Sequence, residues 1–141
     1  MRLTESCDAA LRVLIFAASH RDRLITIDEI VTVFGLPRGT VMKVVNALTR
    51  GNFLAAQRGR SGGLRLARPA TEIRISDVIL HVEPDLNLVE CMRSGNQCVI
   101  TRDCKLISPL QKALGAFIDT LSNYTVADMI LPDASFRRVP A

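Results

Sequence analysis

Apolar residues recur every three or four positions in several stretches of this chain, a spacing typical of amphipathic helices. The first stretch covers residues 4–20, and its apolar face consists of Cys7, Leu11, Leu14, Ile15 and Ala18. Two further stretches cover residues 27–34 and 38–50, and the inward positions of the latter are Val41, Val44, Val45 and Leu48. The pattern therefore predicts three helices in the first 50 residues.

Polar residues, glycine and proline mark the ends of these helices. Thr4 is suited to cap the first helix, and Thr26 with Glu29 forms a capping box for the second. Gly35 stands where a left-handed residue ends a helix, and Pro37 needs no amide partner in a first turn. We therefore expect the second and third helices to be joined by a tight turn.

The hydrophobic pattern then changes to alternation. Residues 53–57 and 64–67 are predicted to be short strands, since Leu64 and Leu66 alternate with Arg65 as in a half-buried strand. The strands would be joined by Arg58-Gly59-Arg60-Ser61-Gly62-Gly63. Three helices followed by a hairpin, in this order, predict a winged helix-turn-helix within a mainly helical protein.

The second half of the chain has one long helical pattern. Residues 76–83 predict a short helix capped by Ser76, whereas residues 85–106 show no clear period. A long helix is expected over residues 109–122, with Ser108 and Gln111 as its capping box and Pro109 in its first turn. Its apolar stripe consists of Leu110, Leu114, Phe117, Ile118 and Leu121.

A short helix is expected after Thr125, and the chain after Pro132 looks irregular. The predicted segments are a winged-helix region (1–84), a cysteine loop (85–106), a dimerisation helix with its C-terminal extension (107–131) and a flexible tail (132–141).

Composition limits the classes of protein that fit. The chain has 141 residues and is 48% hydrophobic, enough for about one domain with one core. It has no run of about 18 apolar residues, so we expect no contact with a membrane. Its N-terminus lacks the pattern of a signal peptide, and we expect a cytoplasmic protein whose thiols stay reduced.

The charge is unevenly distributed. Residues 1–69 contain 11 Lys/Arg and 5 Asp/Glu, whereas residues 70–141 contain 7 and 9. A basic first half favours a polyanionic partner for the predicted winged helix. In such a unit the second helix of the pair enters the major groove, and the hairpin contacts the minor groove or the phosphates.

The candidate DNA-binding residues lie on the third helix and the hairpin. On the helix they are Arg38, Thr40, Lys43 and Asn46, and on the hairpin they are Arg58, Gly59, Arg60, Ser61, Gly62 and Gly63. Arginine and lysine suit guanine acceptors, and glycine lets the backbone approach a phosphate. The alternatives are ordinary solvated charge on the helix and a glycine-rich turn that contacts nothing.

Four cysteines are present, and three of them lie in the loop without a hydrophobic period. Cys7 lies on an apolar stripe, where a free cysteine behaves as a small hydrophobic residue. Cys91, Cys98 and Cys104 are spaced C-x6-C-x5-C, which is too long for typical zinc knuckles. Thiolates bind zinc or iron–sulfur iron. We expect an iron–sulfur cluster, with structural zinc as the alternative.

Several motifs resemble one known family, the winged-helix iron–sulfur repressors. They are Met1-Arg2-Leu3-Thr4, Asp8-Ala9-Ala10-Leu11-Arg12-Val13-Leu14, the hairpin segment 58–66, Ile73-Arg74-Ile75-Ser76-Asp77-Val78, Glu83-Pro84, Leu88-Val89-Glu90-Cys91 with the two later cysteines, and Asn123-Tyr124-Thr125-Val126-Ala127-Asp128. The resemblance covers nearly the whole chain, and the last of these motifs is similar to the nitric-oxide-sensing branch.

The resemblance implies a homodimer built on the long helix, a palindromic double-stranded operator and one cluster per subunit. In the nitric-oxide-sensing branch three cysteines hold a [4Fe–4S] cluster, with [2Fe–2S] as the alternative. Asp8 matches an acidic residue that can supply the fourth ligand to the partner subunit. An ion pair with Arg12, four residues further on, is the alternative role of Asp8.

Three positions depart from the family pattern. Ala9 replaces a frequent aromatic residue, and Pro37 replaces a serine that is frequent at the start of the recognition helix. Ile107 stands where another branch has a histidine ligand nearby, and neither His20 nor His81 lies in the cysteine loop. This difference favours the nitric-oxide-sensing branch.

The leading hypothesis is therefore a transcriptional repressor that senses nitric oxide through its cluster. Cluster nitrosylation or loss would release the operator. Two other hypotheses stay open: a regulator of the same fold that senses iron supply or redox state, and a cluster-bearing electron carrier. We do not expect an enzyme, since the sequence has no Ser/His/Asp or paired-carboxylate arrangement.

Overall fold

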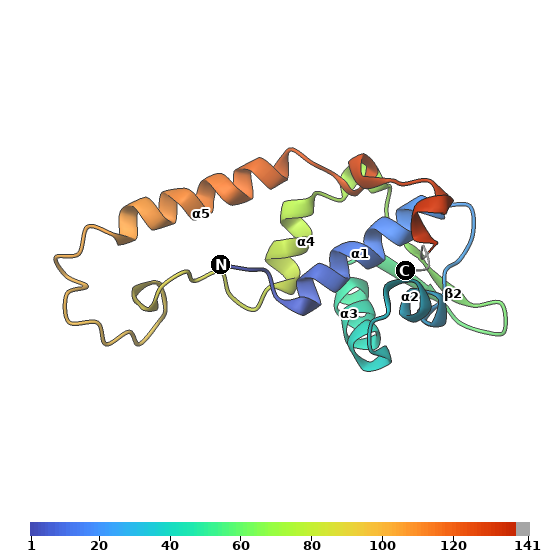
Figure 1. Cartoon of the computed structure of the whole chain (residues 1–141), viewed down its shortest axis with the longest axis horizontal. Coiled ribbons are helices and arrows are strands. Elements are labelled where there is room, and N and C mark those ends of the chain that lie inside the picture. Colours follow the sequence, from blue (N-terminus) through green and yellow to red (C-terminus); the bar gives the residue numbers. More distant parts are fainter. Residues whose placement is uncertain (138–141) are drawn as a thin grey trace.

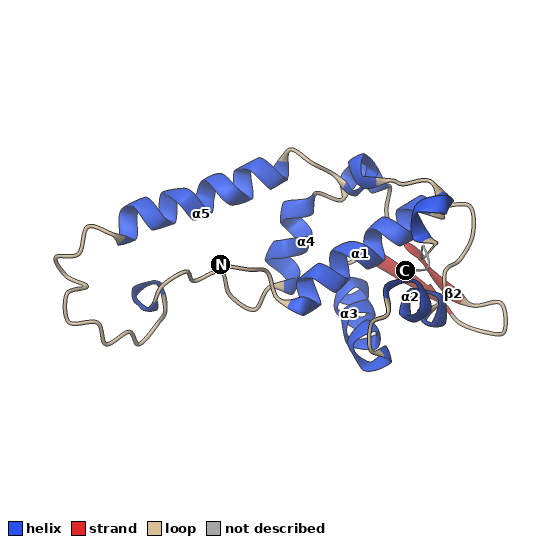
Figure 2. Cartoon of the chain, viewed as in Figure 1, coloured by secondary structure: helices blue, strands red, loops and turns tan. Residues whose placement is uncertain are grey.

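A computed structural model describes residues 1–137 of the chain. Figure 1 shows a group of helices beside a small hairpin, with a long helix and an extended loop to one side. The α-helices are α1 (Glu5–Ser19), α2 (Ile27–Phe34), α3 (Arg38–Arg50), α4 (Ile75–Val82) and α5 (Ile107–Ser122). Short 3-10 turns are η1 (Ala70–Glu72), η2 (Glu90–Met92), η3 (Val126–Met129) and η4 (Asp133–Phe136). Figure 2 shows that the fold is mainly helical with one small sheet, as the sequence predicts.

Helix α1 is the centre of the core. Its N-cap is Thr4, whose hydroxyl accepts a hydrogen bond from the Cys7 amide at 3.2 Å. The helix packs against α3, α4 and strand β2 (Gly63–Leu66), and its buried residues are Cys7, Ala9, Ala10, Val13, Leu14, Phe16, Ala17 and Ala18. Small side chains on this face let the neighbouring helices approach closely.

The helix-turn-helix has the predicted boundaries. Thr26 and Glu29 form the capping box of α2, and Gly35 ends that helix in the left-handed region with φ of 63°. Pro37 is the N-cap of α3, one position before the first turn. The buried stripe of α3 consists of the four predicted residues, Val41, Val44, Val45 and Leu48.

The wing is an antiparallel pair of strands, β1 (Leu54–Gln57) and β2 (Gly63–Leu66). The register pairs Leu54 with Leu66 and Gln57 with Gly63. A bridge between Ile25 and Leu64 joins the hairpin to the segment before α2. This bridge fixes the base of the wing relative to the helix-turn-helix.

Two predicted helix starts are wrong. Helix α4 begins at Ile75 rather than Ser76, and no side chain caps it. Ser76 is 2% exposed, so it lies in the core, and the Ile75 amide donates instead to the Tyr124 carbonyl at 3.0 Å. Pairing with a distant segment thus replaces the expected cap.

The other wrong start is that of α5, which begins at Ile107, two residues before the predicted position. The Leu110 amide donates to the Leu106 carbonyl at 3.2 Å, so the first turn starts earlier than the expected Ser108 cap. Pro109 fits inside this turn because the first amides of a helix need no helical acceptor.

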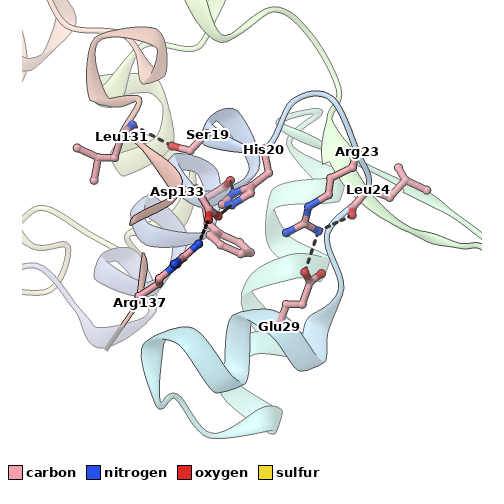
Figure 3. A network of polar contacts seen from close by, with 9 residues as sticks. Ser19, His20, Arg23, Leu24, Glu29, Leu131, Asp133 and Arg137 are labelled. Atoms are coloured by element: carbon pink, nitrogen blue, oxygen red, sulfur yellow. Dashed lines mark hydrogen bonds and ion pairs between the residues drawn. The ribbon is translucent and has the colours of Figure 1, made fainter. Parts of the chain in front are cut away.

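The segment after Pro132 is also more ordered than predicted. Residues 133–136 form η4, and the Phe136 ring contacts the Phe16 ring edge-on with centroids 5.1 Å apart. Figure 3 shows Asp133 beside His20, with the Leu131 amide donating to the Ser19 hydroxyl at 3.0 Å. Aromatic and polar contacts with α1 therefore hold this segment. Residues 138–141 of the predicted tail lie outside the described residues.

No helix in the described part of the chain is long and apolar enough to cross a membrane.

Candidate DNA-binding face and cysteine loop

The predicted residues of α3 lie on its outer side. Arg38, Lys43 and Asn46 are exposed, and Thr40 is half-buried. The Arg38 guanidinium forms an ion pair with Asp28 of α2. This pair joins the two helices at the turn, so Arg38 has a partner within the chain.

Sequence reasoning missed Met42, which is 46% exposed on the same helix. It stands four residues after Arg38 and four residues before Asn46, so it lies between them along the outer face. The spacing could have revealed it, but a methionine in a helix is ordinarily expected in the core.

The wing divides into an exposed tip and a constrained base. Arg58, Gly59, Arg60 and Ser61 are exposed, and Gly59 has φ of 109°. Gly62 and Gly63 have a different reason to be glycine. A Cβ on Gly62 would collide with the Gln57 carbonyl oxygen, and one on Gly63 would lie 2.7 Å from the Ile25 carbonyl oxygen. Folding alone therefore explains these two glycines.

The three loop cysteines are free and half-buried. Cys91 lies in η2, Cys98 follows a turn held by the Asn96 side chain, and Cys104 precedes α5. The Leu106 amide donates to Cys104 Sγ at 3.4 Å, a contact of the kind that stabilises a thiolate. Within residues 1–137 the loop does not bring three ligands together in a metal-binding arrangement.

The donor set nevertheless fits an iron–sulfur group. Three thiols lie within one loop, none of them forms a disulfide, and one sulfur already accepts an amide hydrogen bond. Residues 83–89 are mostly half-buried and hold the start of the loop near the body of the protein. Three thiols are ligands of the type that an iron–sulfur group requires, and the loop would have to close for all three to bind one.

Asp8 is exposed on the first turns of α1, with 54% of its side chain accessible. Its carboxylate lies 2.5 Å from the Arg12 guanidinium, four residues further along the helix. The ion pair that the spacing allows is thus present in the single subunit. The exposed position also leaves the carboxylate accessible to a second copy of the chain.

Cys7 differs from the other three cysteines. It is 0% exposed, and burial together with the nearby Glu83 carboxylate raises the pKa of its thiol to about 12. The interpretation of Cys7 as a core residue is consistent with this environment, because a protonated buried thiol is neither a ligand nor a nucleophile.

The two histidines have partners within the chain. His20 is buried, with Nδ1 2.8 Å from the Phe16 carbonyl oxygen and Nε2 3.0 Å from Asp133. His81 Nε2 lies 2.8 Å from the Ala47 carbonyl oxygen near the end of α3. Both residues therefore contribute to packing between elements.

Glu83, which belongs to the Glu83-Pro84 motif, makes a contact that the sequence did not reveal. Its Oε1 accepts hydrogen bonds from the Thr4 amide at 2.7 Å and the Thr4 hydroxyl at 3.0 Å. Glu83 directly follows α4 and precedes the cysteine loop, so it joins the start of that loop to the N-cap of α1. No local pattern could reveal this contact, because 79 residues separate the partners.

Helix α5 has an apolar face but no buried residue. Its residues Leu110, Leu114 and Phe117 line one wall of a groove of about 720 Å³, whose other walls are residues 1–4 and 83–89. Figure 1 shows α5 extending away from the helices around α1. One side of this helix is thus only partly covered by the chain itself.

These features define a winged-helix DNA-binding regulator, and comparison with known proteins gives its family. A family model described as Rrf2, iron-dependent transcriptional regulator, matches residues 3–132. The chain therefore belongs to the Rrf2 family of transcriptional regulators, which are not enzymes.

Solved structures give the same fold. T. potens IscR is similar with a TM-score of 0.74 and 19% identity, over 92% of this chain and 85% of that one. The oxidized form of Staphylococcus aureus CymR gives a TM-score of 0.71 at 22% identity, over 90% and 94%. CymR of B. subtilis, a global cysteine regulator, gives 0.69 at 19% identity, over 98% and 99%. At these identities the likeness confirms the winged-helix fold.

Proposed function

We propose that the chain is a homodimeric repressor that binds a palindromic operator and responds to nitric oxide through an iron–sulfur cluster. The observation that carries the DNA-binding part is the exposed side of α3. Lys43 and Asn46 face away from the core on the second helix of the pair, and the exposed wing tip adds Arg58 and Arg60. In this proposal α3 enters the major groove and the wing contacts the minor groove.

The uncovered face of α5 supports a dimer. Leu110, Leu114 and Phe117 would bury their apolar surface against a second copy, which is the usual role of such a face. A two-fold dimer matches a palindromic operator because each subunit binds one half-site.

The cluster would be held by Cys91, Cys98 and Cys104, with the partner's Asp8 as fourth ligand. [4Fe–4S] is proposed, one per subunit, with [2Fe–2S] as the alternative. When bound, such a group supplies irons that react with nitric oxide, and the motif over residues 123–128 resembles that of the nitric-oxide-sensing NsrR branch. The family description as iron-dependent is in keeping with this proposal.

The contacts of Glu83 suggest how the loop could influence DNA binding. A change in the loop would act on Glu83 and thereby on Thr4 at the N-terminus of α1. Helix α1 packs against α3, so a shift of α1 would move the recognition helix. The two states would differ in operator affinity, as allosteric control requires.

The cofactor is tested by anaerobic purification and native mass spectrometry. We expect a dimer with one cluster per subunit, lost in Cys98→Ser and kept in the matched control Cys7→Ala. A colourless protein with stoichiometric zinc would contradict the cluster.

The fourth ligand is tested by comparing Asp8→Ala with Arg12→Ala. Both variants remove the ion pair, but only the first removes the carboxylate. If Asp8 binds the cluster, its variant alone changes the visible spectrum and speeds cluster loss. Equal spectra in both variants would leave Asp8 with the ion-pair role only.

The signal is tested by titrating the holo-protein with nitric oxide while operator affinity is measured. A tenfold to hundredfold loss is expected, equivalent to about 1.4–2.7 kcal/mol. Unchanged affinity would exclude nitric oxide as the signal and favour a response to iron supply or redox state.

A further inference from the structure

The outward face of α3 is defined by helical spacing. Gly39, Met42, Lys43 and Asn46 follow the i, i+3, i+4, i+7 pattern, and all four are exposed. The buried stripe follows the same pattern from Val41 to Leu48. The two stripes lie on opposite sides of the helix, so these four residues form its central outer face, with Arg38 and Thr40 at the edges.

Met42 is unusual on this face because it is large and apolar. Its side chain is 46% exposed, and its neighbours one turn away are Arg38 and Asn46. Among the described residues, the other strongly exposed large hydrophobic residues lie at the N-terminus or after the wing: Met1, Leu80, Val99, Ile100, Leu106, Tyr124, Ile130 and Leu131. Among the described residues of this group, Met42 alone therefore lies on the helix-turn-helix.

Gly39 leaves the first turn of α3 open to another molecule. A Cβ at this position would have no atom within 4 Å, so packing within the chain does not require glycine. Glycine inside a helix costs about 1 kcal/mol relative to alanine. In addition, no side chain caps the N-terminus of α3. The first turn is thus open to the close approach of another molecule.

We propose that Met42 is a specificity-determining residue that packs against the 5-methyl group of a thymine in the operator. This inference rests on the proposed binding of α3 in the major groove. The thymine methyl is the apolar group that the major groove presents, and it is absent from every other base edge there. Gly39, one turn before Met42, leaves room for the base edges and phosphates to come close.

The test uses the full-length holo-protein. Preferred duplexes are first selected from random DNA, and each thymine of the selected site is then replaced singly by deoxyuridine. This replacement removes only the methyl group and keeps the hydrogen-bonding groups of the base. At one position of each half-site, the wild-type protein is expected to bind about threefold to fivefold more weakly.

Variants of α3 then test whether Met42 is the residue that contacts this methyl group. Met42→Ala is expected to bind the thymine and deoxyuridine duplexes equally, whereas Met42→Leu keeps part of the preference. Lys43→Ala is the matched control: it weakens binding to both duplexes and preserves their ratio. Thermal unfolding of each variant confirms that the helix is intact.

The outcomes separate the two proposals. If no duplex is enriched, the proposed DNA-binding function fails, and this inference fails with it. If a site is selected but Met42→Ala keeps the wild-type preference for thymine, the operator is bound and the role of Met42 is refuted. Absence of any methyl effect in the selected site would refute it as well.

Discussion

The four cysteines are of two chemical types, which differ in the burial of their side chains. Cys7 is fully buried and its pKa is raised to about 12, whereas Cys91, Cys98 and Cys104 are half-buried in a loop. A thiol reacts with electrophiles as the thiolate, so both accessibility and ionisation act against Cys7.

Alkylation of the cluster-free native protein tests this distinction. Iodoacetamide is expected to modify the three loop cysteines and to leave Cys7 intact until the protein is unfolded. Peptide mass spectrometry of native and urea-treated samples reports each site. Rapid modification of Cys7 at pH 8 without denaturant would contradict its burial.

Gly39 offers a second test at the residue scale, with effects of opposite sign. Gly39→Ala should raise the free energy of unfolding by about 0.5–1 kcal/mol, because alanine favours the helix and its Cβ meets nothing. The same Cβ should weaken DNA binding if the first turn of α3 approaches the duplex. Urea denaturation and operator titration measure the two effects, and Gly115→Ala on α5, where a Cβ also meets nothing, is the control for stability. Stabilisation with unchanged affinity would place the DNA farther from this turn.

Helices and turns whose conformation depends on nearby residues were predictable from the sequence. The capping box of Thr26, the left-handed Gly35 and the stripe of α3 all depend on residues within one or two turns. The errors occur where contacts with residues far away in the sequence determine the structure. Ile75 pairs with Tyr124 at the start of α4, and η4 packs against α1 through His20 and Asp133, 113 residues apart.

The candidate site shows the same division. Lys43 and Asn46 were predictable because polar residues stood at outward positions of an amphipathic helix. The exposure of Met42 was missed because its residue type suggested the core, and the contact of Glu83 with Thr4 was missed because the two residues are remote in the sequence. The three cysteines were predicted to be ligands from their spacing and the family resemblance, but the arrangement that a cluster needs depends on a closed loop, which the sequence does not describe.

The docked C-terminal segment provides a prediction for one element. Phe136 contacts Phe16 and Phe34, and Asp133 accepts hydrogen bonds from His20 and Arg137. Phe136→Ala should release the segment locally, so the Leu131 amide would lose its protection from hydrogen exchange. The exposed neighbour Ser135→Ala should leave that protection unchanged. Equal exchange in wild type and Phe136→Ala would show that the ring contributes little.

The same segment should respond to acid. Hydrogen bonds from His20 and then Arg137 lower the pKa of the Asp133 carboxyl. A carboxyl with a lowered pKa in the folded state stabilises that state above its ordinary pKa, about 3.9, and the contribution is lost as the pH falls through the lowered value. The protection factor of the Leu131 amide, which is its intrinsic exchange rate divided by the observed rate at the same pH, should therefore fall as the pH drops below about 4 in the wild type. Asp133→Asn should show low protection already at neutral pH, without this acid dependence.

At the scale of the whole molecule, the proposed dimer depends on α5. No residue of α5 is completely buried within the single chain. The groove beside Leu114 is bordered by the N-terminus and by the segment that precedes the cysteine loop. A second copy bound there would contact the region that contains Glu83 and would bring its own Asp8 near the first copy. Dimerisation, cluster binding and operator recognition would then depend on one interface.

Leu114→Glu is the variant that tests this dependence. A carboxylate in an apolar interface is costly to desolvate, so the variant should be a monomer of 15.5 kDa where the wild type has twice that mass. Its affinity for the selected palindrome should fall by about a hundredfold or more, since two half-sites are no longer bound by one linked pair. Gln111→Glu adds the same charge at an exposed position of α5 and should keep both the dimer and the affinity. Light scattering and operator titration measure the two quantities.

A Leu114→Glu protein that stays dimeric would place the interface elsewhere. A monomer with full affinity would show that each winged helix binds its half-site independently.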